Sequence, residues 1–387
     1  MNPTATTAAT QLIAAGQAVD PAWLQTQLQW CAQRLDAMLP RFGNRFPSAC
    51  TTDMHYRVKP NDDWTNGFWT AMLLLKNWHW PSTATNSTIQ AQLASFKQRL
   101  ADHYVLDHHD IGFLYSLSSY ADYTFTKAPA DKTLTVAAAD ELIKRFQPRG
   151  QFIQAWGQPG AVNEYRLIID SLMNLPLLFE ASRLSGDDHY AAIARAHYHS
   201  VIQNIIREDQ STYHTFYFDP ATGAPDHGAT HQGFSDESCW ARGQAWILLG
   251  MPLYRKFNPT AAEGAQYRRL LEYYLNHLGA DLIPYWDLTF TAADQQPKDS
   301  SAAAIVACGL IEAQRQGYCD NGVAMARGIV QVLAEHYRTT EGQEGLLQHS
   351  VYAYSEGKGV DEANLWGDYF YMEALQRLAD PAWATFW

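Results

Sequence analysis

Apolar residues recur every three to four positions along most of this chain, which is the spacing of α-helices that pack by one face. Alternation typical of strands is confined to short stretches at Thr215–Phe218 and Ile283–Trp286. The helical spacing marks twelve segments, at residues 21–39, 66–79, 87–104, 111–125, 131–146, 166–183, 188–207, 237–256, 261–278, 299–316, 320–338 and 361–378. The pattern therefore predicts an all-α protein.

The predicted helices alternate between two kinds. Asp188–Arg207 and Ala262–His277 mix polar and apolar residues, as helices with one solvent-facing side do. Leu167–Ala181 and Ser300–Ile311 are apolar or small on nearly all sides, which indicates burial all round. Because outer and inner helices alternate along the chain, we expect a closed double ring with six helices inside six.

No Ser/Gly linker, long charge run or low-complexity tract divides the chain. We therefore expect a tail or short helix over residues 1–20 and a single domain over residues 21–387.

An acidic residue lies near the start of each predicted inner helix, in a loose repeat of one helical hairpin. These residues are Asp63, Asp110, Asp170, Asp236, Asp299 and Asp361. All inner helices of such a ring begin at the same end, so these positions should face one mouth. An Asp at a helix start commonly caps the helix, and we expect that role for Asp236, Asp299 and Asp361.

Asp170 differs from a cap because it lies about one turn inside its predicted helix, among aliphatic residues from Leu167 to Met173. A carboxyl group embedded there loses hydration, which raises its pKa toward the range useful for a general acid. The alternative is a structural Asp that is hydrogen-bonded to a neighbouring helix. For Asp110, which precedes Ile-Gly-Phe, capping and function are equally open.

Arg242 and Trp246 lie one turn apart on a predicted helix and so present a cation and a ring on one face. They could form a stacked pair in the core, or they could clamp the carboxylate and ring of an acidic sugar. Thirteen Trp and 21 Tyr suit a sugar site, although aromatic residues are more often core.

The composition of the chain argues against several classes of function. A net charge of −12 argues against a nucleic-acid partner. Five scattered cysteines indicate free thiols, the N-terminus lacks the pattern of a signal peptide, and no segment is long enough to span a membrane, so we expect a cytoplasmic protein. Among the candidate metal ligands His108, His109, His214, His227 and His231, no pair has HxH or HxxxH spacing on one predicted helix, and we expect neither a metal nor a cofactor.

Several motifs, in order from about residue 60 to the end, resemble the unsaturated glucuronyl hydrolases of glycoside hydrolase family 88. These motifs are DDWTNGFW, HHDIGF, YRLIIDSLMNLPLLFEAS, STYHTFYFDPATG, HQGFSDESCWARGQAW, PYWDL, DSSAAAIVACGLIE and LWGDYFYMEAL. The resemblance implies an (α/α)6 barrel, with Asp110 and Asp170 as the catalytic pair. The positions that match the substrate-binding residues of the family, or flank the catalytic pair, are Trp64, His109, Trp156, His214, Gln232, Arg242 and Trp246.

The resemblance further implies hydration of a 4,5-unsaturated uronic acid at the end of an oligosaccharide left by a polysaccharide lyase. Within the loop 351–359, Lys358 would favour an anionic neighbouring sugar and Glu356 would repel a sulfate. We therefore expect hyaluronan, chondroitin or heparin disaccharides as the class, with a preference for little or no sulfate. The alternatives are an unsaturated rhamnogalacturonyl hydrolase and a non-catalytic carbohydrate-binding protein.

Overall fold

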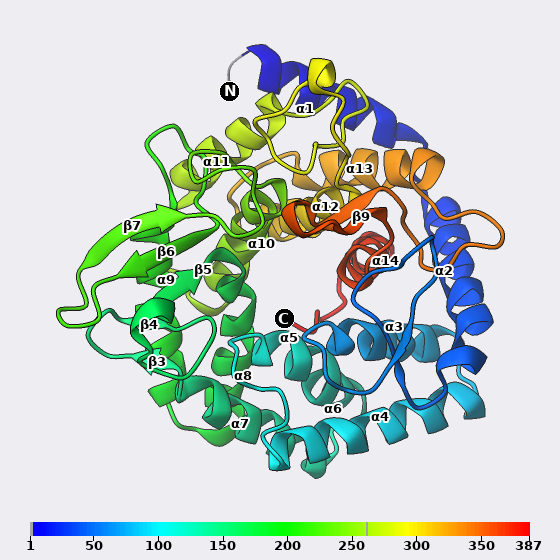
Figure 1. Cartoon of the computed structure of the whole chain (residues 1–387). Coiled ribbons are helices and arrows are strands. Elements are labelled where there is room, and N and C mark those ends of the chain that lie inside the picture. Colours follow the sequence, from blue (N-terminus) through cyan, green and yellow to red (C-terminus); the bar gives the residue numbers. More distant parts are fainter. Residues whose placement is uncertain (1–2, 261) are drawn as a thin grey trace.

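The computed structural model describes residues 3–260 and 262–387, whose helices form a closed double ring (Figure 1). The inner ring closes because each of its helices packs against the next and the last packs against the first. The inner helices are α3 (Asn66–His79), α5 (Ile111–Tyr115) continued by α6 (Ala121–Thr126), α8 (Leu175–Ser185), α10 (Ala241–Phe257), α12 (Ser300–Arg315) and α14 (Leu365–Ala379). Nearly every residue of α10, α12 and α14 is buried, as their sequences predicted.

An outer helix packs against the inner ring in each hairpin, with one face buried and the other in solvent. The outer helices are α2 (Pro21–Phe42), α4 (Thr83–Ala101), α7 (Pro129–Ile143), α9 (His189–Ile205), α11 (Gly264–Asn276) and α13 (Gly322–His336). A further helix, α1 (Pro3–Ala15), lies against α11 and α13. The prediction of an all-α double ring is confirmed.

Short antiparallel strands lie at the end of the ring where the inner helices begin. They are β1 (Phe46–Pro47) with β2 (Val58–Lys59), β3 (Phe146–Gln147) with β4 (Phe152–Ile153), the sheet β5 (Arg166–Ile168), β6 (Thr215–Phe218) and β7 (Pro225–Ala229), and the hairpin β8 (Ser350–Ala353) with β9 (Lys358–Glu362). The strand predicted at Thr215–Phe218 is confirmed. The one predicted at Ile283–Trp286 is wrong, because Tyr285 forms only an isolated bridge with Lys298.

The helix predicted over residues 166–183 is wrong in its first half. The chain there runs through strand β5 and a 3-10 turn, Ile169–Asn174, before α8 begins at Leu175. Pro176 explains the boundary, because a proline lacks the N–H that a helix interior needs and is tolerated in the first turn. Asp170 therefore lies in the 3-10 turn and not inside an α-helix.

Two of the three predicted acidic caps are also wrong. Asp299 does cap α12, since its side chain accepts from the backbone N–H groups of Ser301 and Ala302. Asp236 instead accepts from the backbone of Thr230, and Asp361 lies in β9. Asn364 caps α14 in place of Asp361. Both helices therefore begin about four residues later than their sequences indicated.

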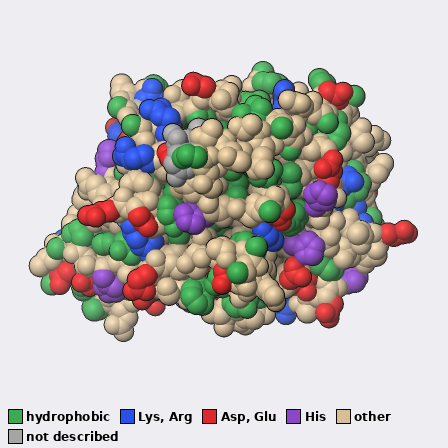
Figure 2. Space-filling model, turned by 90° about the horizontal axis from the view of Figure 1, so that it is seen from above, with side chains coloured by type: hydrophobic (Ala, Val, Ile, Leu, Met, Phe, Trp, Pro, Cys, Tyr) green, Lys and Arg blue, Asp and Glu red, His purple; other side chains and the backbone are tan. Residues whose placement is uncertain are grey.

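The surface carries mixed charge. On the face drawn in Figure 2, Lys and Arg side chains lie scattered among Asp and Glu and form no broad basic band over the described residues. Among these residues, no helix combines the length and the apolar character that crossing a bilayer requires.

Candidate active site

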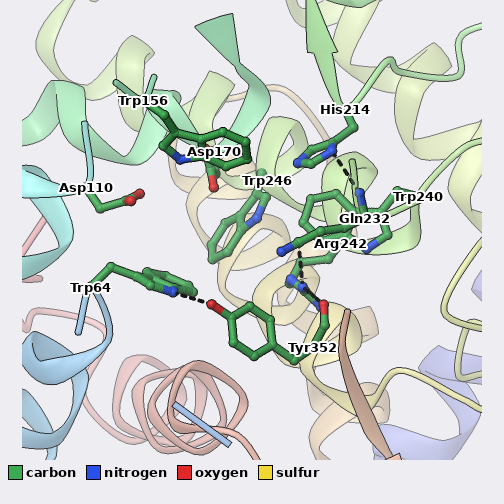
Figure 3. Close-up of a pocket in the computed structure, with 10 residues that line it drawn as sticks. All are labelled: Trp64, Asp110, Trp156, Asp170, His214, Gln232, Trp240, Arg242, Trp246 and Tyr352. Atoms are coloured by element: carbon green, nitrogen blue, oxygen red, sulfur yellow. Dashed lines mark hydrogen bonds between the residues drawn. The ribbon is translucent and has the colours of Figure 1, made fainter. Parts of the chain in front are cut away.

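A cavity opens where the inner helices begin, with about 490 Å³ of empty space including its mouth (Figure 3). Its lining residues come from segments far apart in sequence. They are Trp64, Asp110, Trp156, Asp170, His214, Gln232, Trp240, Arg242, Trp246 and Tyr352. The structure thus brings together eight of the predicted site residues, while the other two, His109 and Lys358, lie outside this lining.

Asp110 and Asp170 meet because their two segments approach unusually closely. Asp110 immediately precedes α5, and Asp170 lies in the 3-10 turn that packs against that helix. Gly112 makes the approach possible, since a Cβ at this position would lie 2.4 Å from the Cα of Asn174. The missing side chain at Gly112 therefore sets the separation of the two carboxyl groups.

His109 links the two carboxyl groups from behind the cavity wall. Its Nε2 lies 3.4 Å from an oxygen of Asp110 and 3.2 Å from an oxygen of Asp170, and its side chain is 1 % exposed. Burial opposes a charge on this ring, but the neighbouring Asp110 and Asp170 raise the pKa of His109. His109 is thus placed to hold the carboxyl groups by charge and geometry.

The two carboxyl groups respond differently to this neighbourhood. Burial raises the pKa of Asp170, and the charge of Asp110 adds to the rise, although His109 opposes it. Burial would also raise the pKa of Asp110, but His109 and His108 lower it below the ordinary value. The pKa values of Asp170 and Asp110 are therefore shifted in opposite directions, which suits an acid beside a carboxylate in a catalytic pair.

The same three side chains could share a metal ion, since one ligand atom from each of His109, Asp110 and Asp170 lies within 4.8 Å of the others. The distances between His109 and the two carboxyl groups are equally those of ion pairs. The absence of a metal stays a prediction.

His214 presents a fixed donor to the cavity. Its Nδ1 accepts from the backbone N–H groups of His231 and Gln232, at 2.9 and 3.2 Å. Burial, together with the charges of His231 and Arg242, lowers the pKa of His214 well below its usual value, so the ring is neutral. The remaining proton lies on Nε2, which is free to donate to a sugar oxygen.

Arg242 forms more hydrogen bonds within the protein than its sequence position suggested. Its guanidinium donates to Asp299 at 3.1 Å, to the carbonyls of Val351 and Tyr352, and to the side-chain oxygen of Gln232 at 3.0 Å. Its direct share in binding a sugar carboxylate is therefore smaller than an unpaired Arg would offer. The contact with Gln232 also occupies the amide oxygen, so that the NH₂ group of Gln232 is the end left to donate.

Aromatic rings form the other walls. Trp64 donates from Nε1 to the hydroxyl of Tyr352 at 2.8 Å, which joins two sides of the cavity (Figure 3). Trp156 is held by the guanidinium of Arg166, 4.6 Å from its ring centre. Trp246 is 1 % exposed and closes the cavity from within the ring.

The loop that carries Glu356 and Lys358 belongs to the hairpin β8–β9, with a 3-10 turn, Tyr354–Glu356, at its tip. Lys358 lies over the ring of Tyr352, with its Nζ 4.0 Å from the ring centre. Glu356 lies 3.4 Å from Nε2 of His231, across the gap between the hairpin and the loop that carries Gln232. Both charges therefore sit at the rim and not on the cavity wall.

Two lining residues were not predicted as site residues. Trp240 directly precedes α10, and Tyr352 lies in β8. Trp240 lies four residues after Asp236, near the predicted start of an inner helix, so its position was a usable signal. Tyr352 had no such signal, because only the pairing of β8 with β9 turns the hairpin toward the cavity.

A ring of helical hairpins with paired carboxyl groups and aromatic walls at its mouth defines an enzyme of the glycoside hydrolase class. The sequence profile of Glycosyl Hydrolase Family 88 matches residues 38–380. This chain therefore belongs to glycosyl hydrolase family 88.

Individual relatives agree with the family assignment. An unsaturated chondroitin disaccharide hydrolase of Streptococcus pneumoniae is 41% identical over 96% of this chain and 93% of its own length. An unsaturated glucuronyl hydrolase of Bacillus sp. (strain GL1) is 38% identical over 88% of this chain and 92% of its own. The crystal structure of an unsaturated glucuronyl hydrolase from Streptococcus agalactiae superimposes with a TM-score of 0.90 and 38% identity, covering 95% of this chain and 94% of that one.

Proposed function

We propose that this enzyme removes the 4,5-unsaturated uronic acid from the non-reducing end of glycosaminoglycan oligosaccharides produced by lyases. The observation that carries the proposal is the pair of carboxyl groups in the cavity. Burial raises the pKa of Asp170, whereas the pKa of the neighbouring Asp110 is lowered. The names of the relatives from Streptococcus pneumoniae and Bacillus support the same class of substrate.

The first step uses the proton of Asp170. The double bond of the unsaturated sugar is a vinyl ether, which is electron-rich at C4. Asp170 transfers its proton to C4, and positive charge develops at C5 and the ring oxygen. Only the acid form of Asp170 can do this, so activity should fall as the pH rises through its pKa.

The second step reverses the role of Asp170. Its carboxylate takes a proton from a water molecule that attacks C5, which restores the acid form. The resulting hemiketal opens, and the bond to the next sugar breaks. Asp110 stays charged, accepts hydrogen bonds from sugar hydroxyls, and by its negative charge helps to keep Asp170 protonated.

The remaining lining residues fit an acidic sugar. The Nε2 proton of His214 and the amide NH₂ of Gln232 can donate to its carboxylate or hydroxyl oxygens, and the buried guanidinium of Arg242 adds positive potential. Trp64 and Trp156 offer ring faces for the sugar C–H groups.

The mutation Asp170→Asn tests the mechanism. It keeps the size of the side chain but removes the transferable proton, so turnover should fall by at least about 10³-fold while the substrate still binds. The measurement is the loss of ultraviolet absorbance of the double bond, with binding followed by calorimetry. Asp226→Asn, at a carboxyl group that is 61% exposed, is the matched control. Near-normal turnover by Asp170→Asn would refute the role.

A panel of unsaturated disaccharides tests the substrate class. Hyaluronan, chondroitin and heparin disaccharides should be turned over faster than an unsaturated rhamnogalacturonan disaccharide. A preference for the rhamnogalacturonan substrate would contradict the proposal. Binding of every substrate without release of product would instead indicate a carbohydrate-binding protein.

We also propose that the substrates carry little or no sulfate and that the enzyme works in the cytoplasm. Glu356 is 49% exposed at the rim and would repel a sulfate beside it, while Lys358 offers one compensating charge. All five cysteines are unpaired, as suits a reducing compartment.

A further inference from the structure

Two aromatic side chains are exposed beside the cavity without lining it. Phe234 is 60% exposed and Tyr354 is 36% exposed, and both belong to the small set of exposed large hydrophobic side chains among the described residues. An apolar ring in water costs free energy that a contact with a ligand recovers, so such rings commonly mark binding surfaces.

These two rings rest on a common base. Tyr354 stacks on the buried Trp286, with ring centres 4.5 Å apart and planes 12° apart. Phe234 packs edge-on against Trp286 at 6.4 Å and against Phe290 at 5.0 Å. We call Phe234, Tyr354, Trp286 and Phe290 the rim cluster. Because Trp286 is buried and Phe290 is partly buried, the two exposed rings are held in place.

The chain joins the rim cluster directly to the cavity. Phe234 follows the lining residue Gln232 by two positions, and Tyr354 follows Tyr352 by two, so each Cα lies within about 7 Å of a lining residue. The backbone N–H of Phe234 donates to Asp287 at 3.0 Å, which fixes the loop.

Two further contacts hold the hairpin that carries Tyr354. Arg242 donates to the carbonyl of Tyr352 at 2.7 Å, and Glu356 meets His231 at 3.4 Å. The loop of Phe234 and the hairpin of Tyr354 are therefore tied together above the cavity.

The proposed function places the reacting end of the substrate inside the cavity and its far end at the mouth. Asp110 lies on one side of the cavity, and Gln232, Trp240 and Tyr352 lie across from it (Figure 3). The unsaturated sugar must lie at Asp170, so the rest of the oligosaccharide leaves through the mouth.

We propose that Phe234 and Tyr354 form a platform that binds a sugar ring beyond the first two of longer unsaturated oligosaccharides. Aromatic faces suit the C–H faces of sugar rings, and they accept such a ring irrespective of its hydroxyl pattern. This inference rests on the proposed function and adds a preference for chain length to it.

The test compares a non-sulfated unsaturated chondroitin disaccharide with the corresponding tetrasaccharide. Phe234→Ala and Tyr354→Leu should each raise KM for the tetrasaccharide about threefold to tenfold, because each removes one ring from the platform. Values of kcat, and KM for the disaccharide, should stay within about twofold. Leu at position 354 keeps Trp286 covered while removing the aromatic face, so folding is preserved.

Trp78→Ala is the matched control, since Trp78 is 43% exposed but lies in the last turn of α3, about 20 Å along the helix from its start near the cavity. Trp78→Ala should leave kcat and KM unchanged for both substrates. Equal effects of the rim variants on both substrates, or no effect on the tetrasaccharide, would overturn the platform alone. A wild-type enzyme that turned over neither substrate would refute the proposed function and the platform with it.

Discussion

At the scale of single residues, the cavity is built from side chains whose partners lie far apart along the chain. Asp170 was identified by its aliphatic neighbours, and the structure does surround it with buried residues. The partners of Arg242 could not be foreseen, because Asp299 and Tyr352 are 57 and 110 residues away along the chain. The position of His109 behind the carboxyl groups of Asp110 and Asp170 likewise depends on contacts between segments far apart in sequence.

Glu356 gives the prediction that belongs to this scale. Glu356→Gln removes the negative charge at the rim while keeping the size of the side chain, so the ratio of kcat/KM for a sulfated disaccharide to that for its non-sulfated counterpart should rise about twofold to fivefold. The shift should shrink at high salt, because exposed charges are screened. Lys358→Gln should move the ratio the opposite way. A ratio unchanged in both variants would show that the rim charges do not set the preference.

At the scale of elements, the sequence predicted which segments are helical, but it placed the first residue of several helices too early. The apolar run through Ile169 was assigned to a helix, yet α8 begins only at Leu175, where Pro176 can occupy the first turn. Periodicity alone does not separate a buried strand and 3-10 turn from a buried helix. The resulting turn matters, because it carries Asp170 toward α5.

Gly112→Ala tests this packing of α5 on the 3-10 turn. The added methyl group would lie 2.4 Å from backbone and side-chain atoms of Asn174, so the two elements must move apart. We expect a loss of about 1–3 kcal/mol in the free energy of unfolding and a larger relative loss of kcat than of substrate affinity. Thermal denaturation and steady-state kinetics measure the two effects. Gly264→Ala, at the start of α11, is the matched control, because the nearest neighbours of an added Cβ there are side-chain atoms of Tyr318 and Arg268, from 3.2 Å.

At the scale of the whole molecule, the alternation of solvent-facing and buried helices was enough to predict the double ring. Six apolar helices are buried together when the outer helices surround a closed inner ring. The ring in turn brings six segment starts to one end, which is why distant residues share the cavity. The tilt of the hairpin β8–β9 over that end depends on contacts across the ring, which local patterns do not encode.

The proposed mechanism depends on a protonated Asp170 inside this cavity. A carbon-13 NMR titration of the aspartate carboxyl groups, with Asp170→Asn to assign the signal, measures that proton directly. We predict a pKa for Asp170 above the ordinary aspartate range, and a further rise in His109→Gln, because burial raises this pKa and His109 lowers it. A pKa at or below the ordinary aspartate range would contradict the mechanism.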